Sequence, residues 1–320
     1  SDLGVPFKPS YWPHNYEPVT DDCLYYSGSE FSLPYRDLAR PAPRGHTVQM
    51  PGSCTGGGKL MEILGAKARR SARILTEARI HALVQNDEGR VIGVTFRKDG
   101  QTHRVRARSG VVLTTGGFVM NREMIGRFAP QAAPLGALGN PYDDGDGIQL
   151  GAATGGATIN MGAVAYTCPI LSPAGLMRGI LVNAIGQRFV DESSNHKRIG
   201  EQSVLHQGGK IFLLVDSDVY EEPTLRMPIV ATGNSPTELE DELGWPAGTL
   251  SATLETYNRH APTGNDPLFG KSREHVRPLD RPPYAVFDCS LDAIPAYHSF
   301  TLGGLMTLAD GHVLTPAGAI

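Results

Sequence analysis

The 320-residue chain lacks the features that mark several protein classes. It carries 29 Lys and Arg against 33 Asp and Glu, a net charge of −4, so no basic excess attracts a phosphate backbone and nucleic acid is not an expected partner. Its apolar runs fall well short of the roughly 20 residues that cross a bilayer, and no basic-then-apolar segment opens the chain. The sequence therefore predicts no membrane span, no signal peptide and a cytoplasmic protein.

Cysteine is scarce. The four cysteines are Cys23, Cys54, Cys168 and Cys289. None forms a C-x-x-C pair and their spacing fits no zinc pattern, so no metal site is expected. Four cysteines in a chain of this length do not indicate a disulfide framework, and we expect buried or incidental thiols in a reducing compartment.

The G-x-G-x-x-G fingerprint of dinucleotide-binding folds is also missing. Gly145 and Gly147 come closest, but the next glycine is Gly151 and no predicted strand precedes them. On spacing alone, no dinucleotide-binding fold can be assigned. The chain does contain 38 glycines and 24 prolines, which predict many turns and close backbone approaches.

Length and apolar patterning predict two globular domains of mixed structure. Residues 1–58 are expected to form an extended, loop-rich segment. Strands are predicted over 73–76, 78–84, 91–96, 102–107, 111–113, 179–183, 188–190, 211–215 and 284–288, with hairpin turns at 86–89 and 99–100. Helices are predicted over about 61–72, over 122–128 with Asn121 as cap, from about 148 after a turn at 143–147, from 236 after Ser235, and over about 247–260, where Leu250, Leu254 and Tyr257 form a core stripe.

Two segments have the composition of a binding site. Thr115, Gly116 and Gly117 follow the predicted strand 111–113, and glycines at a strand end let a ligand approach the backbone because no Cβ intervenes. A plain tight turn explains the same pattern, and is the simpler interpretation of these residues alone.

The second segment lies near the C-terminus. Tyr297 and Ser299 are two residues apart, so both project to one face of an extended strand, and Gly303 and Gly304 follow. Hydroxyls next to open backbone amides suit the binding and polarisation of a ketone. An ordinary buried tyrosine with a satisfied hydroxyl is the simpler interpretation of the residues alone.

Charged residues in the middle of the chain are expected to be structural. Arg188 can pair with Asp191 or Glu192, and a structural ion pair is the default role. His46 and His196 lack metal-ligand spacing.

Several ordered motifs resemble the flavoprotein family of fumarate reductases and 3-ketosteroid dehydrogenases. The matching segments are residues 3–7, 24–28, 43–46, 110–118, 145–148, 186–192 (G-x-R-F-x-[ND]-E) and 301–305 (T-x-G-G-L). The resemblance implies an α+β or α/β fold, in which part of a Rossmann-like FAD-binding domain (1–161 and 291–320) carries an inserted α+β catalytic cap domain (162–290). It also implies FAD as cofactor, with a site formed by Thr115, Gly116, Gly117, Gly145, Asp146, Gly303 and Gly304.

The chain departs from this family in two respects. The family's FAD fingerprint upstream of Leu3 and its closing segment after Ile320 are absent, so we expect the chain to be the middle and late part of a longer protein. His196 stands where fumarate reductases carry a catalytic arginine, which removes the clamp and acid for a dicarboxylate. Tyr297-x-Ser299 instead resembles the ketosteroid 4-dehydrogenases that act on 5α-reduced substrates.

The resemblance implies dehydrogenation of a small hydrophobic ketone, such as a steroid, to the conjugated enone. Tyr297 would remove the proton next to the carbonyl, Ser299 would support its hydroxyl, and Tyr166 is a candidate second hydroxyl. The electron acceptor is left open. Two alternatives remain: flavin-dependent reduction of an unsaturated acid or enone, and a non-catalytic fragment that binds a hydrophobic ligand.

Overall fold

The structure is a computed structural model that describes residues 2–7, 11–12, 25–26, 33–38, 40, 45–46, 48–50 and 56–319. Most of the segment predicted to be loop-rich, with Cys23 and Cys54, therefore lies outside the described residues. Its described elements are β1 (Tyr11–Trp12), β2 (Tyr25–Tyr26), β3 (Gly45–His46) and the short helix α1 (Tyr35–Leu38). β2 pairs in parallel with β1 and antiparallel with β3.

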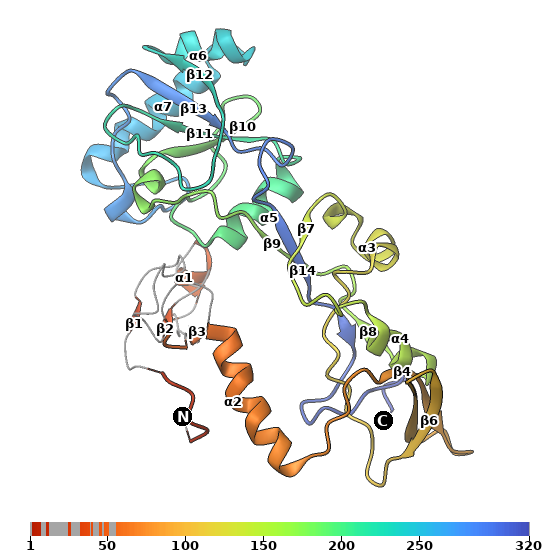
Figure 1. Cartoon of the computed structure of the whole chain (residues 1–320). Coiled ribbons are helices and arrows are strands. Elements are labelled where there is room, and N and C mark those ends of the chain that lie inside the picture. The colour runs from red at the N-terminus through yellow and green to blue at the C-terminus, as the bar shows by residue number, and fades with distance from the viewer. Residues whose placement is uncertain are drawn as a thin grey trace. The chain divides into compact units, whose positions relative to one another are not determined.

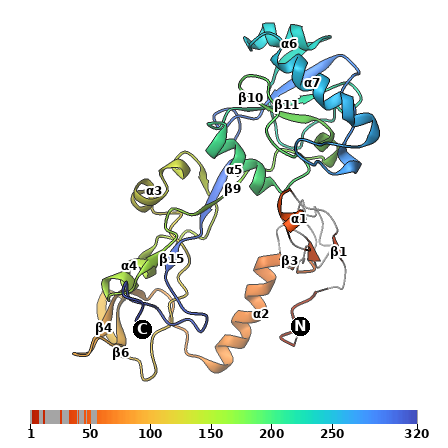
Figure 2. The same cartoon turned by 180° about the vertical axis from the view of Figure 1, so that it is seen from behind.

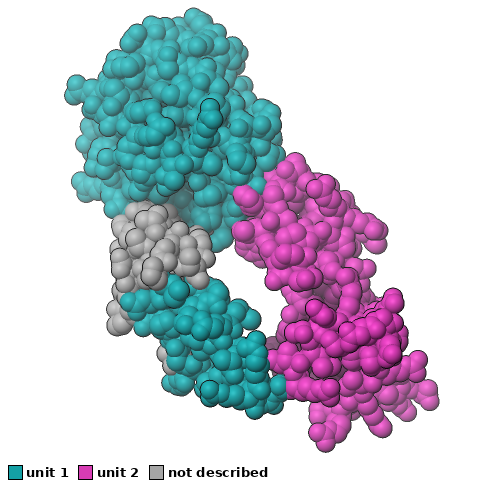
Figure 3. Space-filling view, in the orientation of Figure 1, with its two compact units in different colours: residues 1–72, 166–297 teal, residues 73–165, 298–320 magenta. Residues whose placement is uncertain are grey.

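The chain forms two compact units (Figure 3). Unit 1 comprises residues 1–72 and 166–297, and unit 2 comprises residues 73–165 and 298–320. The predicted domain boundaries after residues 161 and 290 remain a prediction. No helix of the described residues is long and apolar enough to cross a membrane.

Unit 1 is built on a four-stranded antiparallel sheet, which lies beside α6 and α7 (Figures 1 and 2). Its order is β10 (Ile180–Asn183), β11 (Ile211–Val215), β13 (Tyr284–Asp288) and β12 (Ile229–Gly233). The helices are α2 (Gly56–Ser71), α5 (His196–His206), α6 (Pro236–Leu243) and α7 (Thr249–His260), with 3-10 turns η3 (Ala174–Arg178), η4 (Ala261–Thr263) and η5 (Arg273–His275). β11 is buried at four of its five residues, so the core of unit 1 is centred on this strand.

Two helices of unit 1, α6 and α7, begin close to where the sequence predicts. Ser235 caps α6 by accepting a hydrogen bond from the Glu238 amide, with Pro236 in the first turn, and the predicted stripe of α7 is buried. The helix predicted over about 61–72 is confirmed as α2, which begins earlier, at Gly56, and none of its side chains is buried.

Unit 2 contains three small sheets. The predicted hairpins are confirmed as β4 (Arg79–Gln85), β5 (Val91–Lys98) and β6 (Gln101–Arg106), an antiparallel sheet. Asp99 and Gly100 both have positive φ (51° and 75°), which matches the right-handed twist of the strands they join. β7 (Gly136–Ala137) pairs in parallel with β14 (His298–Thr301), in a sheet whose third strand is β9 (Val164–Thr167), and β8 (Thr158–Ile159) pairs with β15 (Gly304–Leu305).

A separate apolar core holds the helices of unit 2. Asn121 caps α3 (Arg122–Phe128) as predicted, and α4 (Asp146–Ala153) begins at the predicted turn, after the 3-10 turn η2 (Pro130–Ala132). The core consists of Phe118, Met124, Ile125, Ala129, Ala132 and Ile148. Phe118 is fully buried and directly follows the predicted glycine turn, so this core fixes the position of the turn.

Three predicted strands are wrong. Residues 73–76 and 111–113 form no strand, and Val112 is 85% exposed. No described strand pairs with either segment, and an apolar run without a hydrogen-bonded neighbour does not become a strand. Residues 188–190 form only a single bridge between Arg188 and Val182, because the Leu181 amide of β10 donates to the Glu192 carboxylate and not to the backbone of this segment.

Candidate functional site

The predicted glycine segments of unit 2 meet one another. The Gly145 amide donates to the Gly117 carbonyl at 3.0 Å, and the Phe118 amide donates to Thr301 Oγ1 at 3.0 Å. Gly147 of α4 lies against Thr115, because a Cβ at Gly147 would overlap the Thr115 side chain. The structure thus brings together the turn at 115–118, the start of α4 and the segment 301–304.

Four of the five predicted glycines satisfy close packing within the chain. A Cβ would overlap the Asp143 carboxyl at Gly116, the Thr301 side chain at Gly117, Phe118 and Met124 at Gly145, and the backbone of Asn160 and Met161 at Gly303. Gly116 and Gly145 also have positive φ, 74° and 79°. Gly304 differs, because no atom lies within 4 Å of the position that its Cβ would take. Of the five, Gly304 is the glycine whose bare backbone is open to a ligand.

The start of α4 is acidic. Arg79 of β4 lies 2.5 Å from the Asp146 carboxylate and 3.1 Å from that of Asp144, and Asp144 also accepts from the Asp146 amide. These carboxylates already meet the positive end of the helix dipole. The carboxylate of Asp146 therefore suits a sugar hydroxyl, which donates, better than a phosphate. Arg79 was not predicted, since only the fold brings β4 to this turn.

The hydroxyl of Tyr297 is buried in unit 1 (the residue is 3% exposed) and held by protein groups. It lies 2.8 Å from Ser203 Oγ of α5, donates to the Cys289 carbonyl at 2.9 Å, and interacts with the Cys168 side chain. Burial strongly raises the pKa of the Tyr297 phenol and raises the pKa of the Cys168 thiol to about 12. Both groups are therefore uncharged at neutral pH.

Tyr166 and Ser299 are also buried. Tyr166 lies on β9, whose backbone at 166–167 packs directly on Gly200 of α5. Ser299 lies on β14 and its carbonyl accepts from the Leu138 amide at 2.8 Å. The serine within hydrogen-bond distance of the Tyr297 hydroxyl is Ser203, which was not predicted.

The helix that carries Ser203 was missed altogether. α5 begins after Asn195, which caps it by accepting from the Lys197 amide. Its buried side is formed by Ile199, Gly200 and Ser203, so the periodic apolar signal of a core-facing helix is weak. The asparagine cap is the signal that could have revealed it.

Arg188 belongs to a buried ion cluster. Its guanidinium binds both oxygens of Glu192 (2.8 and 2.6 Å) and both oxygens of Asp266 (2.7 and 2.9 Å), and lies 5.0 Å from the ring centres of Tyr257 and Phe269. The predicted partner Glu192 is confirmed. Asp266 lies 78 positions away along the chain and was not predicted. Four of the five N–H groups of Arg188 are thus used by carboxylates.

Lys271 completes this cluster. Its ammonium donates to the Gly179 carbonyl at 2.6 Å and lies 3.3 Å from Glu192. Burial lowers the pKa of Lys271 to about 8, although Glu192 opposes that shift. For Glu192, Arg188 and Lys271 outweigh burial and lower the carboxyl pKa. The cluster is a mutually satisfied structural network.

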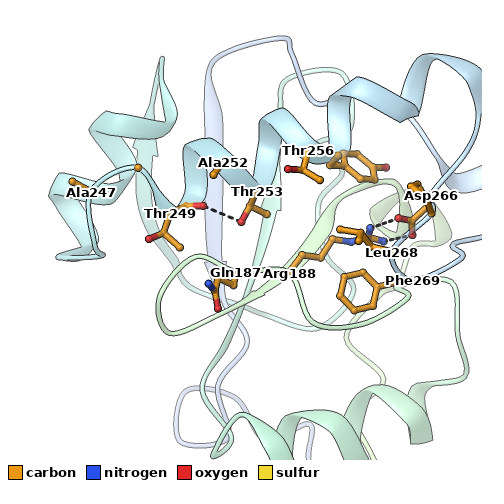
Figure 4. A pocket seen from close by; sticks show the side chains of 13 residues that line it. Gln187, Arg188, Ala247, Thr249, Ala252, Thr253, Thr256, Asp266, Leu268 and Phe269 are labelled. Atoms are coloured by element: carbon orange, nitrogen blue, oxygen red, sulfur yellow. Dashed lines mark hydrogen bonds and ion pairs between the residues drawn. The ribbon is translucent and has the colours of Figure 1, made fainter.

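A cavity of about 590 Å³ lies beside the cluster (Figure 4). One wall is the face of α7 that carries Thr249, Thr253 and Thr256, and another includes Leu268 and Phe269. Arg188 also lines the cavity, but its guanidinium is already bound by Asp266 and Glu192. Arg188 is therefore not available to bind the carboxylate of a substrate in this cavity.

Comparison with known proteins identifies the family. The model of the family described as "FAD binding domain" matches residues 33–320. The chain belongs to this FAD-binding family. FAD is the family's cofactor, and the predicted family, mixed α/β fold and cofactor are confirmed.

Individual relatives include both predicted branches. The crystal structure of a 3-ketosteroid-delta4-(5alpha)-dehydrogenase from Rhodococcus jostii RHA1, in complex with 4-androstene-3,17-dione, is 38% identical with a TM-score of 0.91, over 99% of this chain and 67% of that one. A 3-oxo-5-alpha-steroid 4-dehydrogenase of Comamonas testosteroni is 26% identical over 78% of this chain and 59% of its own length. An NADH:acrylate oxidoreductase of Vibrio harveyi is 28% identical over 78% of this chain.

The chain spans only part of its curated relatives, from 27% of the Vibrio harveyi protein to 59% of the Comamonas testosteroni protein. The described residues nevertheless fit FAD. Gly304 has open space beside its backbone, and the Asp146 carboxylate, although paired with Arg79, is 41% exposed, so both leave room for a bound group. The roles of the predicted cofactor residues themselves remain proposals.

The buried cluster allows a first prediction. Replacing Arg188 with Ala leaves Glu192 and Asp266 buried without their shared cation and should lower the free energy of unfolding by about 3–5 kcal/mol. Arg259→Ala is the matched control, because it breaks an exposed pair with Glu255 and should cost less than about 1 kcal/mol. Urea denaturation measures both, and equal losses would contradict the structural role of Arg188.

Asp191 allows a second prediction. Burial raises its pKa to about 6, although Ser193 donates to it. The folded protein then binds more protons than the unfolded chain between about pH 4 and 6, so Asp191 lowers the free energy of unfolding as pH rises through that window. The free energy of unfolding of Asp191→Asn, relative to that of wild type, should therefore rise by on the order of 2–3 kcal/mol between pH 4 and pH 7. Denaturation at several pH values measures this difference in the free energy of unfolding, and a difference that stays constant with pH would contradict the raised pKa of Asp191.

The neighbouring glycines give a third prediction. Gly303→Ala should destabilise the protein by about 1–3 kcal/mol, because its Cβ meets backbone, whereas Gly304→Ala should leave stability nearly unchanged. Gly304→Ala should instead weaken FAD binding roughly tenfold, since its methyl covers the open backbone. Thermal unfolding and flavin fluorescence titration separate the two effects. Unchanged FAD affinity in Gly304→Ala would rule out contact at this position.

Proposed function

We propose that the protein is an FAD-dependent dehydrogenase that converts a 3-ketosteroid-like ketone to the conjugated enone. The observation that carries this proposal is its 38% identity, over 99% of the chain, to the steroid-bound dehydrogenase of Rhodococcus jostii. The substrate would be a small hydrophobic ketone, such as a 5α-reduced steroid. The free thiols of Cys168 and Cys289 support a reducing, cytoplasmic location.

The charges of unit 1 favour a ketone over a dicarboxylate. Reduction of a dicarboxylate calls for cations that clamp the substrate and deliver a proton. Arg188 is engaged by Glu192 and Asp266, and the first residue of α5 is His196. The groups around Tyr297 are uncharged hydroxyl, thiol and carbonyl groups, which suit a neutral substrate.

The reaction removes a proton from the carbon next to the carbonyl and a hydride from the carbon beyond it. When bound, FAD accepts the hydride. We assign removal of the substrate proton to Tyr297. Ser299 and Tyr166 would be further hydroxyls of the site. The amide of Gly303 or Gly304 would donate to an oxygen of the flavin ring or of the substrate carbonyl. Tyr297 acts as a base only as the phenolate, so its single proton, which it donates to the Cys289 carbonyl in this structure, must first pass to solvent; the carbonyl accepts the hydrogen bond but cannot take the proton itself.

Tyr297→Phe tests this assignment. In the FAD-loaded protein with a 5α-reduced 3-ketosteroid and a dye as oxidant, kcat should fall by roughly 10²–10⁴-fold with KM largely kept, because only the proton-transferring oxygen is lost. Tyr142→Phe, at an exposed position, is the matched control and should turn over like wild type.

Turnover of Tyr297→Phe at the wild-type rate would rule out Tyr297 as the base. Turnover of an enone or unsaturated acid with reduced dye, in the absence of ketone dehydrogenation, would instead support the reductase alternative.

A further inference from the structure

We propose that Ser203, on α5, is a positioning residue that donates a hydrogen bond to the phenol oxygen of Tyr297 and stabilises its deprotonated form. This inference rests on the base role proposed above for Tyr297. Neither the glycine motifs nor the Tyr-x-Ser motif points to Ser203. It is identified by the contact that α5 makes with the phenol.

The direction of the hydrogen bonds follows from the number of protons. The Tyr297 hydroxyl lies 2.9 Å from the Cys289 carbonyl and 2.8 Å from Ser203 Oγ. The carbonyl can only accept, so the single phenol proton points to Cys289. The proton between Ser203 and Tyr297 then belongs to Ser203, and Ser203 is the donor.

The packing of α5 fixes the place of this donor. Gly200, one turn before Ser203, lies so close to the backbone of 166–167 that a Cβ would stand 3.0 Å from it. The amide of Cys168 also donates to the His196 carbonyl at 3.2 Å, and Ser203 is fully buried. Ser203 is thus held on the packed side of the helix, with little freedom to leave the phenol.

Ser203 is an unfavourable residue type for a buried position inside a helix, so its presence in α5 calls for a physical explanation. Serine is less favourable than alanine inside a helix, and a buried hydroxyl without a partner costs free energy. The bond to Tyr297 satisfies the hydroxyl. A purely structural role predicts only that its loss lowers stability, whereas a positioning role also predicts a change in the ionisation of Tyr297.

The expected electrostatic effect has a definite sign. Burial and the neighbouring thiols of Cys168 and Cys289 disfavour the phenolate of Tyr297 and raise the phenol pKa, whereas the bond from Ser203 opposes them by favouring the charged form. Because the base acts in its deprotonated form, removal of the donor shifts the rising limb of the pH profile to higher pH.

The experiment compares Ser203→Ala with Ser194→Ala in the FAD-loaded protein. Ser194 is also buried in unit 1, but its hydroxyl donates to the Asp191 carbonyl. We expect Ser203→Ala to lower kcat about tenfold near neutral pH, to move the rising limb up by about one pH unit, and to leave KM nearly unchanged. Ser194→Ala should do none of these, and Ser203→Cys, with a weaker donor, should be intermediate.

The double variant separates the two proposals. In Tyr297→Phe, the added Ser203→Ala change should leave the residual turnover unchanged, because its target oxygen is gone. An unshifted pH limb in Ser203→Ala, or an equal loss of turnover with and without the phenol oxygen, overturns the role of Ser203 alone. Full turnover in Tyr297→Phe overturns the proposed function and the role of Ser203 with it.

Discussion

Unit 1 depends on the pairing of one buried guanidinium. Arg188 holds Glu192 and Asp266 together, and Glu192 in turn accepts from the Leu181 amide of β10. Buried charges persist only when they are paired and hydrogen-bonded, so this contact fixes the path of the chain from β10 through residue 192. Asp191 and Ser193 continue the network, and the Ser193 hydroxyl accepts from the Ser272 amide.

This pairing also sets the position of the proposed base. α5 begins at His196, four residues after Glu192, and its start is tied to the amide of Cys168. Its Ser203 then meets Tyr297. The ion cluster thus lies just before the helix that carries Ser203, so the segment G-x-R-F-x-[ND]-E can support the proposed site through the position of α5.

The sequence predicts local structure well where one residue type has one physical role. Asn121 and Ser235 cap helices, and the turns at Asn86 and Asp99 form hairpins, because capping and turn chemistry are local. Contacts between distant segments were not predictable. Asp266 pairs with Arg188 across 78 positions, and no periodicity reveals it. α5 was missed because Gly200 and Ser203 pack through their small size, which carries no apolar signal.

The glycines show why composition alone gives an ambiguous site. Gly116, Gly117, Gly145 and Gly303 are required by close packing inside unit 2, whereas Gly304 has open space above its backbone. The same residue type therefore serves the fold at four positions and is available to a ligand at the fifth. Only the surroundings of each Cα distinguish the two uses, so a glycine-rich motif indicates a close approach without saying what approaches.

The surroundings of the Tyr297 hydroxyl are compatible with both a structural role and a role as a base. Complete burial and bonds to Ser203 and Cys289 are what a structural phenol requires, and they also exclude water from a base. The distinguishing feature is the mixture of its partners. The Cys289 carbonyl favours the neutral phenol, since it accepts the proton, while the Ser203 donor favours the phenolate. Loss of the phenol proton to solvent therefore breaks only the bond to Cys289, while the bond from Ser203 remains to stabilise the phenolate; a phenol surrounded only by acceptors would have no such donor.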